Sequence, residues 1–356
     1  MIVNKKTVVA LLLVPQVLLV RVLSFFPEFV ERWYSRGVYV YISKFSRAVL
    51  GWLPVSFGDL VYAVVLVFVL WWCFSNRQRL FRQTRLWFVD VFAFLSVVYF
   101  LFHVFWGLNY YRQPLYRNLN LEAQYTTTQL VNVTKRLIEK ANATHIEITH
   151  NDSVKVVVPY TKADVLKRAP LGYLELKKVF VGLNYTPVSI KKSLFSLPLT
   201  YMGFSGYLNP FFNEAQVNGC IPVYKFATTA THEMAHQLGY AAENEANFIG
   251  CLAAINNNDI YFKYCGYTFG LRYCLNEIYR RDKALYSTVI KTLNTGVLEN
   301  YKEVRLFWED HKNPAEPLFK SFYNGFLKAN KQAKGIGSYS YVVALLVNYI
   351  DKHGKI

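Results

Sequence analysis

The sequence predicts a mostly helical α+β protein, in which three membrane helices precede a domain with a small antiparallel sheet. Three observations lead to this fold class. Long apolar runs are concentrated near the start of the 356-residue chain. Beyond Asn256, apolar residues recur at helical spacing to the end of the sequence. Between Lys191 and Tyr224, apolar stretches flank a glycine-rich turn, which is typical of two paired strands.

Residues 1–108 are expected to form the membrane region, with spanning helices at about residues 7–26, 57–74 and 86–108. Each run can cross the hydrocarbon layer once its flanks are counted, and the last two carry no charge at their centres. The first run also has the basic start of a secretory signal peptide. No small-x-small cleavage site follows it, so an uncleaved membrane helix is the favoured interpretation.

Residues 27–56 mix arginines and lysines with aromatic and aliphatic side chains, a pattern typical of amphipathic helices at a membrane surface. Four arginines lie between residues 77 and 85 with no acid among them. The positive-inside rule places this loop in the cytoplasm, and Lys5 and Lys6 place the N-terminus on the same side. Residues 109–356 are then expected outside the cytoplasm.

The charge and the cysteine content of the sequence limit the binding partners and metal sites that can be expected. A formal charge of +17 could indicate nucleic acid, but no nucleic-acid motif accompanies it and several basic residues flank apolar runs as topology signals. The lipid bilayer is the expected partner, and nucleic acid is not. The five cysteines contain no C-x-x-C pair, so a cysteine zinc cluster is not expected. Buried free thiols are favoured, although a bridge between Cys265 and Cys274 stays open.

The second domain is predicted to start with a helix that begins near residues 126–128, followed by short strands within residues 146–158. A helix over residues 162–180 is expected to break or kink at residues 170–172. Residues 191–224 are predicted to form two strands joined by a loop at residues 207–213. Five helices then complete the chain, at Ile260–Arg281, Leu285–Leu293, Glu299–Trp308, Pro317–Lys331 and Tyr339–Lys352.

One motif carries chemistry. His232-Glu233-Met234-Ala235-His236 has the form H-E-x-x-H. On a helix the two histidines lie on one face and can share a metal, while Glu233 reaches the water bound beside it. Zn²⁺ accepts two neutral imidazoles and a carboxylate and keeps a fourth position for water. The metal acidifies that water, and a carboxylate can take its proton during attack on a carbonyl. The motif predicts zinc-dependent hydrolysis of a peptide or protein substrate.

The third zinc ligand is expected from the helix that follows Gly239. Glu243 and Glu245 compete for this role, and the two positions are separated by roughly 200° around a helix, so both cannot face one metal. Glu243 shares a face with Asn247, which could hydrogen-bond a ligand from behind. Glu243 is therefore the predicted ligand, and Glu245 remains the alternative.

These residues resemble known proteins. H-E-x-x-H followed by Glu243-Asn244-Glu245-Ala246-Asn247 resembles the gluzincin metallopeptidases. A closer resemblance, over nearly the whole chain, is to the bacterial membrane proteins of domain of unknown function 3810, which have a predicted zinc-peptidase domain. It is carried by residues 54–59, 105–112, 201–210, 214–218 and 232–250.

The resemblance implies a zincin-like domain at residues 109–356, on the periplasmic or extracellular side of a multi-pass bacterial membrane protein. It also implies that the first glutamate, Glu243, is the ligand, although Asn247 stands where many gluzincins have aspartate. In zincins, an edge strand above the metal pairs with the substrate backbone, and residues 191–224 are the candidate segment. An ordinary core hairpin is the other interpretation of that segment.

Several questions stay open at the level of sequence. Tyr207, Tyr240 and His311 are candidates for stabilising the transition state, and nothing ranks them. The oligomeric state is not predicted. A non-catalytic envelope protein with a structural metal is an alternative function, although such a site needs no base at Glu233. An intramembrane protease is less favoured, because the stretch around His232 is too polar for hydrocarbon.

Overall fold

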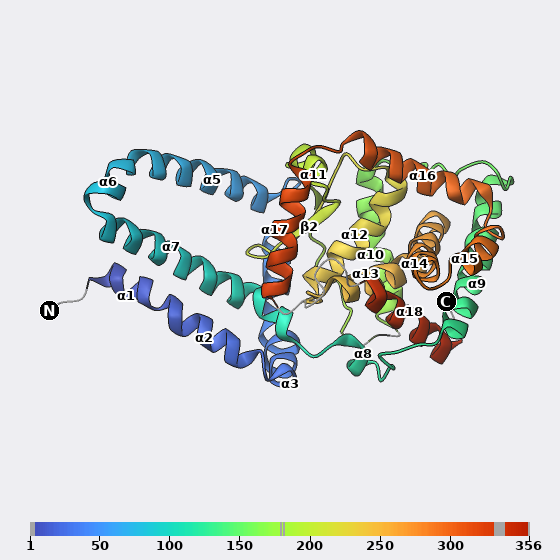
Figure 1. The fold of residues 1–356 in the computed structure, drawn as a ribbon, viewed down its shortest axis with the longest axis horizontal. Helices are drawn as coiled ribbons and strands as arrows, with labels where there is room; N and C mark the ends of the chain where they lie inside the picture. The colour runs from blue at the N-terminus through green and yellow to red at the C-terminus, as the bar shows by residue number, and fades with distance from the viewer. Residues whose placement is uncertain (1–3, 179, 181, 331–338, 355–356) are drawn as a thin grey trace.

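A computed structural model describes the whole chain except residues 1–3, 179, 181, 331–338 and 355–356. The described part is mostly helical with one small sheet, as predicted. Figure 1 shows long helices projecting from one side of a globular body. The predicted fold class is confirmed.

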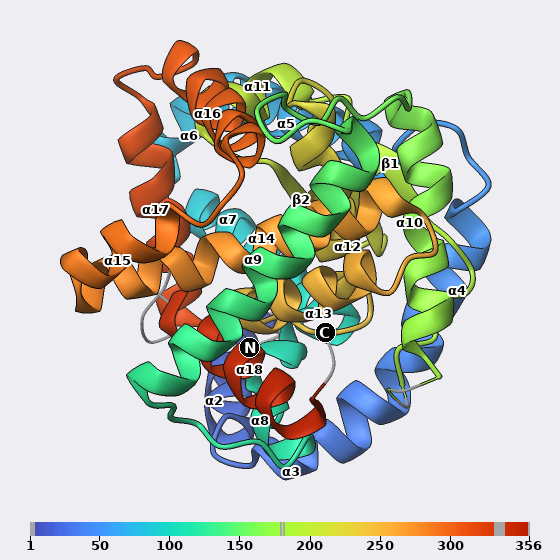
Figure 2. The ribbon, with the colours of Figure 1, turned by 90° about the vertical axis from the view of Figure 1, so that its right-hand side faces the viewer.

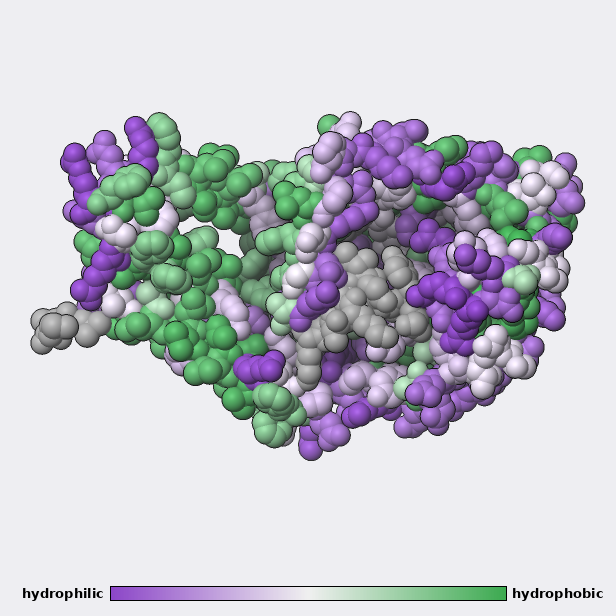
Figure 3. All heavy atoms as spheres, viewed as in Figure 1, coloured by the Kyte–Doolittle hydropathy of each residue, from purple (hydrophilic) through white to green (hydrophobic). Residues whose placement is uncertain are grey.

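Three stretches are long and apolar enough to cross a membrane, at Lys5–Leu23, Phe57–Ser75 and Thr84–Phe105. The first comprises α1 (Lys5–Leu11) and α2 (Leu13–Leu23); the others are α5 (Phe57–Ser75) and α7 (Thr84–Phe105), joined by α6 (Arg77–Arg82). Figure 3 shows hydrophobic atoms covering this part of the surface. The third helix ends before the predicted residue 108, because the backbone of Trp106 leaves the helical region with φ −159° and ψ −40°.

The ends of these helices distant from the globular body are held together by one carboxylate. Asp90 on α7 accepts from Lys6 at 2.8 Å and from Arg79 at 3.1 Å. Farther along, the amide of Gln16 donates to the Ser96 hydroxyl at 3.1 Å and joins α2 to α7. The basic residues that predict the cytoplasmic side therefore lie together at one end of the membrane region.

The amphipathic segment folds as α3 (Pro27–Phe29), η1 (Val30–Val38) and α4 (Tyr39–Leu50). Two polar side chains of α4, Ser43 and Arg47, are buried against the globular body. Three large aromatic side chains of the segment are turned outward, and Tyr41, Phe45 and Trp52 are each more than 70% exposed. This arrangement is the reverse of a water-facing helix and suits contact with lipid.

The globular body contains one 3₁₀ turn and eleven helices among the described residues. Their bounds are η2 (Gly107–Tyr111), α8 (Leu115–Asn118), α9 (Thr127–Thr149), α10 (Lys162–Leu176), α11 (Ser196–Met202), α12 (Val223–Gln237), α13 (Glu243–Ile255), α14 (Ile260–Arg281), α15 (Lys283–Ile290), α16 (Thr295–Asp310), α17 (Glu316–Ala329) and α18 (Tyr339–His353). Helices α12, α13 and α14 lie at its centre, with α9, α10 and α18 packed around them (Figure 2).

The sheet has three strands, β1 (Ile190–Lys192), β2 (Gly206–Asn209) and β3 (Glu214–Val217), in the order β1-β3-β2. Strand β2 is antiparallel to β3, but β1 is parallel to it, so the sheet is mixed and not wholly antiparallel. The predicted two-strand arrangement is partly wrong, because Ser196–Met202 forms helix α11 and residues 207–209 of the predicted loop belong to strand β2. That helix buries Leu199 and Thr200 and ends at Gly203, whose φ of +79° suits glycine.

Two other predictions differ from the structure. The strands expected within residues 146–158 do not form; α9 continues to Thr149, and the Asn300 side chain bonds the N–H and carbonyl of Val156, both at 3.0 Å. The break expected at residues 170–172 is absent, since α10 continues through Pro170. There Gly172 lies directly against the Ala253 carbonyl of α13, where a side chain would not fit. The five cysteines are free thiols.

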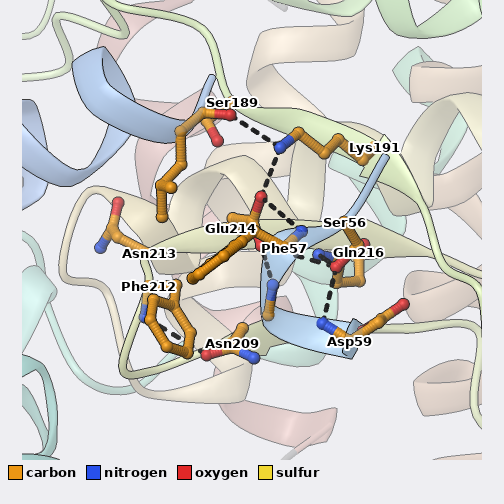
Figure 4. Close-up of polar contacts among 12 residues, drawn as sticks. Ser56, Phe57, Asp59, Ser189, Lys191, Asn209, Phe212, Asn213, Glu214 and Gln216 are labelled. Carbon is orange, nitrogen blue, oxygen red and sulfur yellow. Dashed lines mark hydrogen bonds and ion pairs between the residues drawn. The ribbon is translucent and has the colours of Figure 1, made fainter. Parts of the chain in front are cut away.

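A buried carboxylate joins α5 to the sheet (Figure 4). Glu214 of β3 accepts from the backbone N–H groups of Phe57 at 3.3 Å and Gly58 at 2.6 Å, and from the ammonium of Lys191. The start of a helix has unpaired N–H groups and a positive dipole end, so a carboxylate there is stabilising. Asp59, on the first turn of the same helix, accepts from the Leu194 N–H at 2.7 Å. The membrane helix is thus bonded directly into the body.

Candidate metal centre

Helix α12 presents the H-E-x-x-H motif. The chain enters it after Pro222 and leaves at Gln237, and Gly239 reverses the direction with a φ of +87°. His232 and His236 are one turn apart on the helix, with ring centroids 4.6 Å apart. Both side chains are mostly buried, at 13% and 6% exposed.

The turn after α12 brings α13 back along it, and Glu243 at its first position faces both histidines. Its Oε2 lies 3.4 Å from Nε2 of His232, and its Oε1 lies 3.7 Å from Nε2 of His236. Donor atoms around a tetrahedral zinc, each bonded at about 2.0–2.1 Å, are about 3.3 Å from one another. The two distances from Glu243 are close to this spacing, so the three side chains could hold a metal ion.

The imidazole of His236 is oriented for metal binding. Its Nδ1 lies 2.7 Å from the carbonyl of Tyr240, which fixes the proton on Nδ1 and leaves the Nε2 lone pair directed toward Glu243. Burial lowers the pKa of His236 to about 4, so the ring is neutral as a ligand must be. Burial opposes ionisation of Glu243, but the hydrogen bond and charge of His232 and the charge of His236 lower its pKa to about 2.

Glu233 lies beside this cluster and makes no ion pair with any residue that the structure describes. The ligand-type atoms of His232, Glu233 and His236 are all within 4.8 Å of one another. Oε2 of Glu233 is buried and has no hydrogen-bond partner among the described residues. Burial raises the pKa of Glu233 to about 8, although the charge of His232 opposes this shift. A carboxyl group with this pKa is mostly protonated at pH 7, and a cation bound beside it would favour the ionised form that a general base needs.

Strand β2 lies next to the same carboxylate. A side chain at Gly206 would meet Oε1 of Glu233 at 2.7 Å, so glycine permits the strand to lie this close. Strand β2 is also an edge of the sheet, with β3 on its inner side. Its outer edge is unpaired among the described residues.

The competing glutamate points elsewhere. Glu245 accepts a hydrogen bond of 2.6 Å from the backbone N–H of Leu115. Burial raises its pKa to about 7, opposed first by the charge of Arg112. Asn247 is half-buried and makes no hydrogen bond to the cluster within the described part of the chain. The structure therefore brings Glu243, and not Glu245, to the two histidines.

The three candidates for transition-state stabilisation are engaged in other contacts. The Tyr207 hydroxyl donates to Asp59. The Tyr240 ring packs under the guanidinium of Arg112, 4.2 Å from its centre. The ring of His311 packs against Phe307 at 4.6 Å and Tyr201 at 5.7 Å. None of these contacts includes His232, His236 or Glu243.

One residue at the site was not predicted from sequence. The hydroxyl of Tyr323, on α17, donates to Oε1 of Glu243 at 2.7 Å. Its ring packs against Phe204 at 5.3 Å. Tyr323 lies 80 residues after Glu243 in an amphipathic helix, and no motif surrounds it. Sequence spacing gave no signal for this contact.

The end of α12 that carries His236 is bonded to the membrane region. The indole N–H of Trp106, immediately after α7, donates to the His236 carbonyl at 3.1 Å. Tyr39 and Ser43 of α4 both donate to the Gln237 carbonyl at 2.9 Å. Arg112 donates to the Gly239 carbonyl at 2.8 Å. These bonds satisfy carbonyls that a helix end leaves free.

Arg112 is itself held by a buried ion pair. Its Nε and Nη2 contact Glu31 of η1 at 2.8 and 2.9 Å, and both side chains are less than 10% exposed. Burial alone would raise the pKa of Glu31, but the hydrogen bond and charge of Arg112 lower it. The amphipathic segment thus supports the turn between α12 and α13.

Comparison with known proteins identifies one family. Residues 34–347, most of the chain, match the model of the family described as protein of unknown function (DUF3810). No curated protein and no solved structure matches the sequence significantly. The matched region contains α12 and α13, and the chain belongs to the DUF3810 family.

Proposed function

We propose that this protein is a membrane-anchored zinc metallopeptidase that hydrolyses peptide bonds outside the cytoplasm. The observation that carries the proposal is the convergence of His232, His236 and Glu243, with the unpaired carboxylate of Glu233 beside them. A purely structural zinc site tends to use four protein ligands and has no need of a free, desolvated acid.

His232, His236 and Glu243 would hold the metal. When bound, a zinc ion supplies a water of lowered pKa and polarises the substrate carbonyl. The orientation of the ligands depends on other residues of the protein. The Tyr240 carbonyl holds His236 in the ligating tautomer, and Tyr323 holds one oxygen of Glu243 in place.

Glu233 would act as the general base and then as the general acid. Its carboxylate has no competing hydrogen bond at Oε2, so that oxygen is free to accept a proton from water and return it to the leaving amine. Strand β2 passes beside it at Gly206, with its outer edge unpaired in the described chain. A substrate backbone that paired along this edge would be brought next to Glu233.

The test uses the full chain purified in detergent. Metal analysis should find zinc near one per chain, and a peptide library read by mass spectrometry should show cleavage that a chelator removes. Glu233→Gln should keep the zinc and lose about a hundred- to ten-thousand-fold in rate. Full activity in this variant would remove Glu233 from the mechanism. A zinc-loaded wild-type protein that cleaves no peptide would favour the non-catalytic alternative.

A further inference from the structure

A second cluster of charged side chains lies along α12, away from the metal ligands. Lys225 and Arg272 line a small pocket between α12, α14 and α16, whose cavity volume is about 20 Å³. These three helices lie together in the globular body (Figure 1). Among the residues that the structure describes, the lining of the pocket has two cationic groups and no carboxylate.

The hydroxyl groups in this pocket are already used within the protein. Tyr224 donates to the Thr268 hydroxyl at 2.7 Å, and Thr268 donates to the Tyr264 carbonyl at 2.8 Å. Tyr301 donates to the Thr268 carbonyl at 2.6 Å, and Thr228 donates to the Lys225 carbonyl at 3.2 Å. The polar groups left for a ligand are the two cations.

Neither cation has an anionic partner among the described residues. The Lys225 ammonium lies over the Phe269 ring at 4.8 Å, and the Arg272 guanidinium lies 6.0 Å from the ring of its neighbour Tyr273. The nearby carboxylate of Glu303 is paired with Lys155 at 2.7 Å. Burial and then the charge of Arg272 lower the pKa of Lys225 to about 7, and an anion bound in the pocket would favour the charged ammonium.

The pocket is aligned with the metal centre. Lys225 and His232 are seven residues apart on α12, which places them on the same face and about 10 Å apart along its axis. Thr228, one turn before His232, is part of the pocket wall. The charge of Lys225 also acts on Glu233 and His232.

We propose that Lys225 and Arg272 form a subsite that binds a substrate carboxylate beside the metal centre. This proposal rests on the proposed peptidase function and adds a substrate class to it. An extended peptide spans about 3.3–3.6 Å per residue, so the carboxylate lies about three residues from the bond that is cut. It belongs either to the C-terminus of the substrate or to an acidic side chain.

The experiment uses the zinc-loaded full chain in detergent and peptides that differ only in their carboxylates. One library has neutral sequences with free C-termini, a second has the same sequences amidated, and two further amidated libraries carry Glu or Gln at each position. Cleavage is followed by mass spectrometry. Binding of the same peptides is measured separately with the inactive Glu233→Gln protein.

If the carboxylate is terminal, the wild-type protein should release fragments of about three residues, and amidation should stop this. If it is a side chain, the Glu library should be cut about three residues from the acid and the Gln library should not. In either case Lys225→Met and Arg272→Met should weaken carboxylate-dependent binding by about tenfold or more. Lys263→Met, on the opposite face of α14, is the matched control and should leave binding unchanged.

The two proposals fail in different ways. In one outcome, neither amidation of the peptides nor replacement of Glu by Gln changes cleavage or binding. This result would overturn the proposed carboxylate subsite but not the proposed peptidase function. Binding that depends on a carboxylate and on Lys225, without any cleavage by the wild-type protein, would support the subsite and overturn the peptidase. Loss of binding in Lys263→Met equal to that in Lys225→Met would also overturn the subsite, since a general charge effect would then explain both.

Discussion

The hydroxyl of Tyr323 donates a 2.7 Å hydrogen bond to Oε1 of Glu243, the oxygen that lies 3.7 Å from Nε2 of His236. This bond ties α17 to the first residue of α13. It also leaves Oε2 of Glu243 on the side of His232. A tyrosine distant in sequence thereby fixes how the carboxylate is presented to the two imidazoles.

Tyr323→Phe should therefore weaken zinc binding by about ten- to hundredfold without unfolding the protein, since partners that orient a ligand have effects of that size. Zinc affinity, measured by competition with a chromophoric chelator, checks this expectation. Tyr279→Phe, at an exposed position on α14, is the control and should bind zinc like the wild type. Equal affinities for the wild type and Tyr323→Phe would show that the hydrogen bond does not position the ligand.

Substitution of the two glutamates of α13, Glu243 and Glu245, should have different effects on zinc content. Glu243→Ala removes the side chain that faces both histidines and should lose zinc and activity together. Glu245→Ala should retain zinc but lose about 1–3 kcal/mol of stability, because the buried N–H of Leu115 loses its acceptor. Zinc content and thermal unfolding of both variants test this pair. Zinc loss in Glu245→Ala alone would mean that the assignment of the ligand is reversed.

The Glu31–Arg112 pair should make stability depend on pH. The folded pKa of Glu31 lies below its unfolded value of about 4.3, so its contribution is complete above that value and is lost as pH falls toward the folded pKa. Glu31→Gln should cost about 3 kcal/mol at pH 7, because it leaves Arg112 buried without a counter-ion. The difference from the wild type should shrink below pH 4.

The matched control for this experiment is Glu299→Gln, which breaks the exposed pair with Lys302 and should cost less than about 1 kcal/mol. Denaturant unfolding in detergent at pH 7 and at pH 3.5 gives both comparisons. If Glu31→Gln and Glu299→Gln are equally stable at pH 7, the buried pair does not support the turn between α12 and α13.

Topology is testable with reporters. Because the arginines of residues 77–85 should remain in the cytoplasm, a phosphatase that is active only outside the cytoplasm should be active when fused after Ile356. The same phosphatase inserted after Gln83, between α6 and α7, should be inactive. The reverse pattern would place the candidate metal centre in the cytoplasm and overturn the proposed compartment.

Much of the fold follows from local signals in the sequence. Helix α14 matches its predicted bounds at both ends, because Asp259 caps its start and its apolar face is continuous. The membrane helices were found from hydrophobicity and length. Gly239, after which the second helix was expected, has the positive φ that suits glycine at the end of a helix.

The missed features depend on contacts between distant segments. Strand β1 is stabilised by pairing with β3, about 25 residues later in the chain. A strand of three residues is too short to show an alternating pattern of hydrophobic residues, so the sequence did not predict it. Tyr323 and Arg272 reach the two sites from helices whose sequences only suggest amphipathic or buried packing. Within the candidate site, H-E-x-x-H and the helical spacing identified the cluster, because those residues are close in sequence as well as in space.

Trp106 is the first residue after the third apolar helix, and its indole bonds the carbonyl of His236. In a bilayer, this bond, together with those from Tyr39 and Ser43 to the Gln237 carbonyl, would then fix the height of the candidate centre above the lipid. If the protein has the proposed peptidase activity, this fixed height would limit which peptide bonds it can reach. In a substrate anchored in the same membrane, only bonds close to the point where its chain leaves the lipid would be cut. Cutting the chain after Trp106 to obtain a soluble fragment would remove both the apolar helices and the indole that bonds the His236 carbonyl.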